Sequence, residues 1–360
     1  MYPDRVLPPL LRLALPAAAA CAWTAWWRHH YRVEPSADEL HWARTPDGWR
    51  LALWRWRPRG RPVRRHPVLL VHGLSAGRVG WDLDPSLSFA RHLAGRGFEV
   101  WVLEHRGHGA SDRPRPGTGR AWGFTADDYA LVDVPAALDL IRERSGADAV
   151  HWVGHSQGGI VLYMHLASGG EGVRAGVTIG SALDYSGTES DFHQLLQLLD
   201  LARVLPAFPL GPLSTFGAPF MGRVPNRVEE FNVWPPNIDP ELSRRLHATC
   251  FHPVSSGVLL QFATMFQEGG LRSADGRRAY LPGLAAARVP VLAISGSMDR
   301  QCTPAASART VQALGGEKAA RTFGKAHGQP EEYGHFDLVV GKRAPSETWP
   351  AIAEWLEARD

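Results

Sequence analysis

In the middle of the chain, a strand-like segment runs directly into a serine that has a glycine on either side, and few folds accommodate this pattern. Residues 148–153 are expected to form a buried strand, and Gly154-His155-Ser156-Gln157-Gly158 follows at once. Residues 160–167 then have the pattern of a helix. A turn this tight between a strand and a helix requires glycines, because side chains there would obstruct the close approach of the backbone. The segment therefore predicts an elbow that holds the Ser156 hydroxyl at the end of a sheet.

Strand and helix patterns alternate along much of the chain. The other expected strands are residues 67–71, 98–103, 173–179, 289–294 and 319–323, and the expected helices are residues 127–144, 304–314 and 347–358. Two further strands, residues 40–44 and 49–57, flank the hairpin signal Asp47-Gly48. This alternation predicts an α/β fold with a mostly parallel central sheet flanked by helices.

The alternation stops between residues 184 and 287. A stretch of about a hundred residues is too long for a plain loop in a compact domain, so we expect an inserted cap with helices at residues 191–205 and 258–267. The chain then divides into an apolar segment (1–33), a first core part (34–183), the cap (184–287) and a second core part (288–360). The cap residues expected to form an apolar wall, or else to pack only on one another, are Leu195, Leu196, Leu198, Leu199, Phe208, Phe216, Phe220, Trp234 and Phe262.

The N-terminal segment is long and apolar. Residues 6–27 contain Arg12 as their sole charge and approach the roughly 20 residues needed to span a bilayer, although three prolines weaken the helix. The segment predicts membrane association, with Arg28 and Arg32 keeping the main domain cytoplasmic. Two alternatives stay open: a helix packed on the body of a soluble cytoplasmic protein, or a cleaved signal peptide of a secreted one.

Charge and cysteine content exclude several classes of protein. Lys and Arg number 39 against 36 Asp and Glu, an excess too small to indicate nucleic acid as a partner. The three cysteines, Cys21, Cys250 and Cys302, are far apart in sequence. They form neither a disulfide framework nor a metal-binding spacing.

A serine hydroxyl becomes a nucleophile only beside a base that a carboxylate orients. The expected base is His335, which follows the last predicted strand, and His327 is its rival. The expected carboxylate is Asp299, directly after the strand at residues 289–294, with Asp184 and Asp337 as alternatives.

The oxyanion of such a reaction needs two backbone donors. We expect them to be the N–H groups of Gln157, at the start of the helix, and of Leu74, in the loop after the strand at residues 67–71. His72, in the same loop, could shape the loop or carry a proton.

These motifs together resemble the α/β-hydrolase superfamily over roughly residues 40–360. The elbow at Ser156, Trp122-Gly123-Phe124 and Tyr333-Gly334-His335-Phe336-Asp337 are most similar to the acid lipases and, more distantly, to polyester synthases. The synthases carry a cysteine where this chain has Ser156, which favours hydrolysis. The secreted acid lipases have a signal peptide and glycosylation sites, and neither is evident in this chain.

The residues and the resemblance imply the same chemistry. An acyl group would pass to Ser156 and then to water, without a metal or organic cofactor, from a small-molecule or lipid-like ester with an apolar acyl chain. An acyltransferase or thioesterase is the alternative enzyme. A catalytically inactive binding protein is the alternative outside enzymes, although it would be expected to lack one of the three triad candidates.

Overall fold

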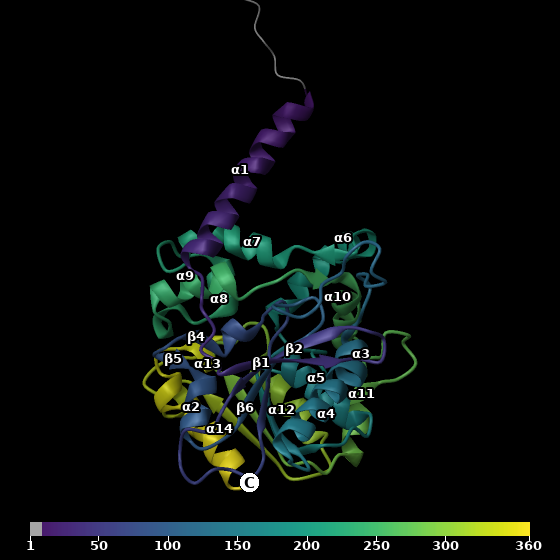
Figure 1. Cartoon of the computed structure of the whole chain (residues 1–360), viewed down its shortest axis with the longest axis vertical. Coiled ribbons are helices and arrows are strands. Elements are labelled where there is room, and N and C mark those ends of the chain that lie inside the picture. The colour runs from purple at the N-terminus through teal and green to yellow at the C-terminus, as the bar shows by residue number, and fades with distance from the viewer. Residues whose placement is uncertain (1–8) are drawn as a thin grey trace, which may run out of the picture.

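An eight-stranded sheet forms the centre of the computed structural model, which describes residues 9–360 and leaves out the side chains of residues 9–15 and 195–199 (Figure 1). In spatial order the strands are β1 (Glu39–Arg44), β2 (Arg50–Trp56), β6 (Val100–Glu104), β3 (Val68–Val71), β7 (Val150–His155), β8 (Val173–Ile179), β11 (Val291–Gly296) and β12 (Lys318–Phe323). The pairs β1–β2 and β2–β6 are antiparallel, and all others in this sheet are parallel. The predicted α/β fold with a mostly parallel sheet is confirmed.

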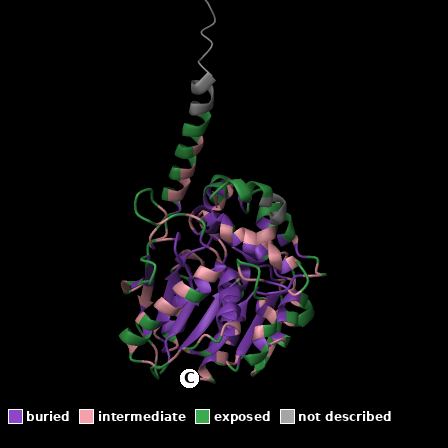
Figure 2. Ribbon diagram, turned by 90° about the vertical axis from the view of Figure 1, so that its right-hand side faces the viewer, coloured by how far each residue is buried: buried purple, intermediate pink, exposed green. Residues whose placement is uncertain are grey.

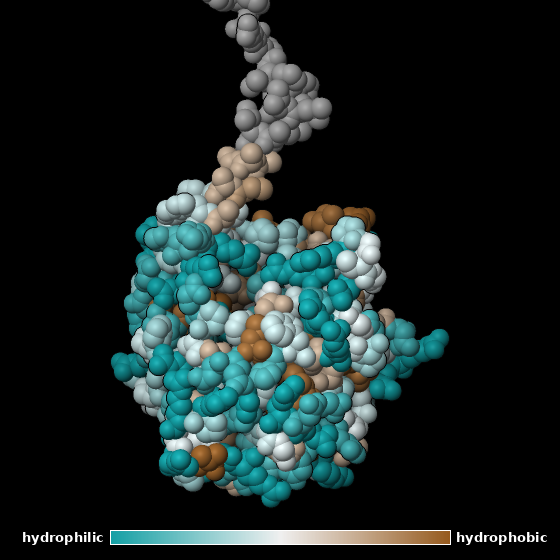
Figure 3. Space-filling view, in the orientation of Figure 1, coloured by the Kyte–Doolittle hydropathy of each residue, from teal (hydrophilic) through white to brown (hydrophobic). Residues whose placement is uncertain are grey.

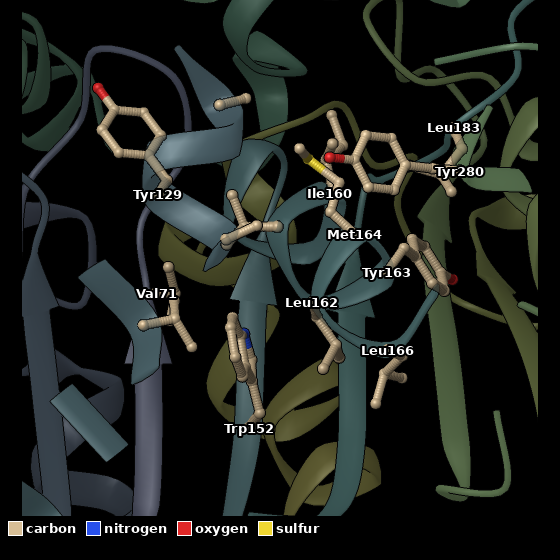
Figure 4. Close-up of a cluster of buried hydrophobic side chains, with 14 of the residues drawn as sticks. Val71, Tyr129, Trp152, Ile160, Leu162, Tyr163, Met164, Leu166, Leu183 and Tyr280 are labelled. Atoms are coloured by element: carbon tan, nitrogen blue, oxygen red, sulfur yellow. The ribbon is translucent and has the colours of Figure 1, made fainter. Parts of the chain in front are cut away.

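Both faces of the sheet are buried, as Figure 2 shows. Alternate side chains of β3 point to opposite faces: Leu69 and Val71 join one apolar cluster, and Val68 and Leu70 join the other. The first cluster, part of which appears in Figure 4, is covered by α4 (Val134–Ser145), α5 (Gln157–Ala167) and α12 (Pro304–Gln312). The second is covered by α2 (Phe89–Gly95) and α14 (Thr348–Glu357). Because the central strands are buried on both faces of the sheet, their sequences are continuous apolar runs.

Several of the expected helices have other bounds in the structure. The helix expected at residues 127–144 consists of α3 (Ala126–Asp128), a π turn (Tyr129–Asp133) and α4, which is followed by Gly146 in the left-handed conformation. Helix α5 begins at Gln157 rather than at residue 160, so the helix starts immediately after Ser156. The elbow therefore has no intervening loop.

The segment between β8 and β11 contributes no strand to the central sheet of the described chain. Its elements are α6 (Leu199–Val204), α7 (Leu210–Gly217), α8 (Arg227–Asn232), α9 (Pro240–Thr249), α10 (Ser256–Phe262), α11 (Tyr280–Gly283) and the pair β9 (Ala207–Phe208) and β10 (Val254–Ser255). The first half of the helix expected at residues 191–205 is a 3₁₀ helix, Asp191–Leu198. Figure 1 shows α6, α7, α9 and α10 at the end of the molecule from which α1 extends. The division into domains stays a prediction.

The first helix, α1 (Pro9–His30), extends away from the body of the molecule (Figure 1). Its C-terminal part contacts the cap, because Trp23 Nε1 donates to the Phe216 carbonyl at 3.1 Å and an Arg28 guanidinium nitrogen donates to the Phe251 carbonyl at 3.0 Å. The packed-helix alternative therefore describes only the end of α1. Among residues 9–360, no helix combines the length and the apolar character needed to cross a membrane. Residues 6–8 of the predicted apolar segment lie outside the described residues.

Candidate active site

The elbow between β7 and α5 places Ser156 in a backbone conformation that is rare outside glycine, with φ of 51° and ψ of −118°. Such a conformation persists only where its surroundings enforce it. The Ser156 N–H donates to the Ile179 carbonyl at 2.7 Å, and the Ser181 hydroxyl donates to the Ser156 carbonyl at 2.8 Å. A Cβ at Gly158 would collide with the Val71 carbonyl, so the close approach of α5 to β3 requires glycine there.

His335 and Asp299 meet beside the elbow. Nδ1 of His335 donates to Oδ2 of Asp299 at 2.7 Å, and both side chains are buried. Oδ1 of Asp299 accepts the backbone N–H groups of Gln301 and Cys302, each at 2.8 Å. These two amides fix the carboxylate, which in turn fixes the imidazole. Nε2 of His335 is buried and has no hydrogen-bond partner in the described chain, so it is free to accept a proton.

The two alternative carboxylates have other partners. Asp184 accepts from the N–H and hydroxyl of Ser186 and lies 3.2 Å from the Arg309 guanidinium. Asp337 accepts the backbone N–H groups of Trp234 and Gly334 and contacts Asn237. The rival base His327 is exposed, in the short helix after β12. Of the candidate acids and bases, the structure brings Asp299 and His335 together.

His72 shapes the loop that carries Leu74. One ring nitrogen, Nδ1, donates to the Gly73 carbonyl at 2.9 Å, and the other accepts the His105 N–H at 3.2 Å. Burial lowers the pKa of His72 to about 3, so its ring is neutral at pH 7. With both ring nitrogens occupied, His72 has the structural role that was one of the two predicted alternatives.

The expected oxyanion donors flank the elbow. Leu74 lies on the wall of the cavity that Ser156 also lines, and Gln157 is the first residue of α5. Neither backbone N–H donates to another group of the described chain. The N-terminus of α5 adds the positive end of a helix dipole. Two free donors at this point suit an oxygen atom that gains negative charge.

A cavity of about 620 Å³ opens at Ser156 and His335. Its volume is that of a site for a small ligand. Its wall is mixed: polar and charged residues also line it, among them the ion pair between Asp191 and Arg300. The apolar side chains that line it are Leu74, Phe192, Phe208, Leu210, Leu213, Met221, Val228, Phe231, Phe251 and Phe336.

Most of the aromatic residues expected in the cavity wall lie elsewhere. Phe208 lines the cavity, but Phe262 is buried in the core and Phe216 and Phe220 are about half exposed. Trp234 donates through Nε1 to Glu331 instead. The side chains of Leu195, Leu196, Leu198 and Leu199 lie outside the described part. Composition indicated an apolar cap, but the directions of its side chains depend on how short helices turn, which no periodicity in the sequence revealed.

Sequence reasoning also missed a contact that joins the elbow to the segment that carries His335. Nε2 of His155 donates to the His335 carbonyl at 3.2 Å, and the two rings lie 4.6 Å apart. Burial holds the pKa of His155 well below its usual value, which keeps the ring neutral. Its position next to the nucleophile candidate was the only signal available in the sequence.

The mostly parallel sheet, the serine elbow after a central strand and the histidine after the last strand define the class of α/β hydrolases. A family model described as "alpha/beta hydrolase fold" matches residues 66–342, and the chain belongs to that family.

Comparison of this chain with known proteins also shows a similarity to lipases. The chain is 32% identical to gastric triacylglycerol lipase of Mus musculus over 132 residues, 34% of this chain and 33% of that lipase. It is 34% identical to lipase member K of Homo sapiens over 135 residues, 35% of this chain and 34% of that protein. The chain thus spans about a third of the length of the curated relatives it matches. Monoglyceride lipase of Saccharomyces cerevisiae, in a soluble variant, has the same fold, with a TM-score of 0.61 and 17% identity over 91% of this chain and 97% of that one.

Proposed function

We propose that this protein hydrolyses carboxylic esters with an apolar acyl chain, with Ser156 as nucleophile, His335 as general base and acid, and Asp299 as the residue that orients His335. The observation that carries the proposal is the 2.7 Å contact between His335 Nδ1 and Asp299 Oδ2 beside a cavity that Ser156 lines. The similarity to lipases over a third of the chain supports the same reaction.

In the first half of the reaction, Oγ of Ser156 bonds to the ester carbonyl carbon while its proton passes to Nε2 of His335. The carbonyl electron pair moves to oxygen, where the N–H groups of Leu74 and Gln157 stabilise it. Asp299 stabilises the imidazolium that forms. Collapse of the intermediate breaks the bond to the alcohol, which leaves with the proton from His335. Water then repeats these steps on the acyl-enzyme and releases the acid.

The cavity wall supports an apolar acyl chain as the group that is bound. Each buried methylene contributes about 0.8 kcal/mol to binding, and such a gain needs an apolar surface beside the nucleophile. The wall near Ser156 includes Phe208, Leu210 and Phe251. We expect kcat/KM for p-nitrophenyl esters to rise from acetate towards medium and long chains, and a preference for acetate would reject the apolar acyl site.

The nucleophile is tested by Ser156→Ala. Loss of a triad member costs on the order of 10⁴–10⁶ in kcat, so hydrolysis should almost disappear while the thermal midpoint changes little. A fluorophosphonate probe should label the unmodified protein but not the variant. Ser168→Ala, at the end of α5, is the matched control and should keep both activity and labelling. Undiminished labelling of Ser156→Ala would refute the assignment.

Membrane contact through α1 and the cap belongs to the same proposal. Helix α1 has no acidic residue and ends in Arg28, His29 and His30, which suits an anionic lipid surface. Exposed apolar side chains of the neighbouring cap are Leu201, Val204, Leu205, Leu213, Phe216, Phe220, Val224 and Val228. Figure 3 shows apolar surface over the cap near α6. Exposed apolar side chains gathered on one part of a protein are typical of an interaction site.

Vesicle binding tests the membrane contact. The full chain should co-sediment with vesicles of phosphatidylglycerol and phosphatidylcholine, and a chain that lacks residues 1–22 should bind them at least ten-fold more weakly. Trp23 and Arg28 remain in that chain, so its contacts with the cap are kept. Hydrolysis of a soluble short-chain ester serves as the control for folding. Equal sedimentation of both chains would refute a role for the helix in lipid binding.

A further inference from the structure

Three residues that are far apart in the sequence meet at the opposite end of the sheet from Ser156. His66 precedes β3, His151 is the second residue of β7, and Asp360 follows α14. Figure 1 shows the C-terminal end of the chain on the side of the molecule away from the cap. One ligand atom from each residue lies within 4.8 Å of the other two. Sequence spacing missed this group because none of its members are neighbours along the chain.

The distances in this group fit a tetrahedral ion. Oδ1 of Asp360 lies 3.2 Å from Nδ1 of His66 and 3.5 Å from Nε2 of His151. Zinc bonds to nitrogen and oxygen are about 2.0–2.1 Å long, so a tetrahedral ion separates its ligand atoms by about 3.3–3.4 Å. Two of the three edges between the ligand atoms are therefore already close to the required length, without an ion in place.

The carboxylate and one imidazole are held in position by neighbouring groups. The backbone N–H groups of Arg65 and His66 each donate to the Asp360 carboxylate at 2.9 Å. Nε2 of His66, the nitrogen that faces away from Asp360, lies 3.5 Å from Oδ1 of Asp148. Partners of this kind orient the ligands of metal sites and fix the tautomer of a histidine.

His151 supplies an independent sign of a missing partner. Its side chain is fully buried, and neither of its ring nitrogens makes a hydrogen bond within the described chain. A buried polar group without a partner is costly and calls for a ligand, an ion or a water. Nε2 of this ring lies 3.5 Å from Oδ1 of Asp360 without a hydrogen bond to it, and an ion bound to both atoms would give this nitrogen a partner.

We propose that His66, His151 and Asp360 bind one divalent transition-metal ion, for which zinc is the best match to two imidazoles and a carboxylate. The ion joins the start of β3, the start of β7 and the end of α14, and water completes its coordination. His151 lies five residues before Ser156 on an extended strand, a separation of about 16 Å. The ion therefore stabilises the fold and takes no part in chemistry at Ser156, so the inference is independent of the proposed function.

Zinc binding to the full chain tests the proposal. Protein without an affinity tag, first treated with a chelator, should bind one Zn²⁺ per chain in calorimetric titration. At 100-fold excess over Kd the thermal midpoint should rise by about 4 °C. Co²⁺ in place of Zn²⁺ should give the strong visible absorption of a tetrahedral site. Asp360→Asn and His151→Gln should each weaken Zn²⁺ binding at least ten-fold.

The matched control is His41→Gln. Nε2 of His41 lies 2.8 Å from Glu39, so it forms a histidine–carboxylate pair without the second histidine, and its loss should leave zinc binding unchanged. The Arg65 and His66 amides donate to different oxygens of Asp360, so Asp360→Asn keeps the size of the side chain and an acceptor for one of them. It therefore carries the test even where His151→Gln fails to fold. No zinc binding by the unmodified chain, or undiminished binding by Asp360→Asn, would overturn the proposal.

Discussion

Replacing Asp299 by Asn isolates the electrostatic role of this carboxylate from its structural role. Oδ1 accepts two backbone N–H groups at 2.8 Å, from Gln301 and Cys302. An asparagine must therefore keep its carbonyl oxygen on that side and turn its NH₂ group towards Nδ1 of His335. Nδ1 would then accept a hydrogen bond, and the proton of the ring would move to Nε2. A histidine in this tautomer cannot take the proton of Ser156.

The magnitude follows from this tautomer change. The variant loses both the correct tautomer and the negative charge that stabilises the imidazolium, so kcat should fall by about 10⁴, or about 5.5 kcal/mol of transition-state stabilisation. The size of the side chain and its two backbone hydrogen bonds are kept, so the thermal midpoint should change by only a few degrees. The fall in kcat should therefore occur in a protein that is still folded.

The assay is steady-state hydrolysis of a p-nitrophenyl ester, with circular dichroism as the control for folding. Asp184→Asn and Asp337→Asn are the matched controls, because their carboxylates bind other partners and are not in contact with His335. Both should keep kcat within about ten-fold of the unmodified protein. Near-normal turnover by Asp299→Asn together with a large loss in Asp184→Asn would refute the reasoning and reassign the acid to Asp184.

Two further predictions concern stability. Burial lowers the pKa of His72 to about 3, whereas in the unfolded chain it is about 6.5. Between these two pH values the unfolded state binds one more proton than the folded state. The stability present above pH 6.5 is therefore lost as the pH falls towards 3. Near pH 5, His72 alone should contribute about 1.4 kcal/mol per pH unit to the slope of the free energy of unfolding against pH, as measured by denaturant unfolding. His72→Gln should reduce this slope by the same amount, and an unchanged slope would contradict the prediction. Gly159→Ala would place a Cβ 2.8 Å from that of Ser181 and 2.9 Å from that of Thr178, so it should destabilise the protein by about 1–3 kcal/mol and lower kcat. The control is Gly95→Ala in α2, where no atom lies near the new methyl group, so this change should be neutral or stabilising. Equal effects of the two substitutions on thermal unfolding would contradict the packing argument.

The order of strands and helices could be read from the sequence because each buried strand of this fold is a short continuous apolar run. Residues 173–179 match β8 in full, and residues 67–71 and 319–323 match β3 and β12 within one residue at each end. The bounds of α5 could not be read, because the helix begins at Gln157 through a strained serine rather than through an ordinary capping residue. Local propensity contains no signal for strain that the tertiary structure imposes.

The candidate site was predictable to the extent that its residues follow strands. Ser156 and Asp299 lie just beyond the carboxyl ends of β7 and β11, where the parallel arrangement brings side chains together, and His335 lies in the longer segment that follows β12. The cavity wall was not predictable, because most of its residues lie on short helices and turns of the cap. Phe231, near the end of α8, and Phe251, just after α9, both line the cavity, and only the path of the chain between these helices brings them to it.

The contacts of α1 connect this helix to the cavity. Arg28 donates to the carbonyl of Phe251, and the side chain of Phe251 lines the cavity. Leu213 and Val228 also line the cavity, yet each is more than half exposed, so the cavity mouth and the apolar outer surface share residues. A lipid surface in contact with α1 and these side chains would therefore lie against the cavity mouth. An apolar substrate could then pass from the lipid surface to Ser156 without its acyl chain first being hydrated, and the free energy of that hydration grows with each methylene.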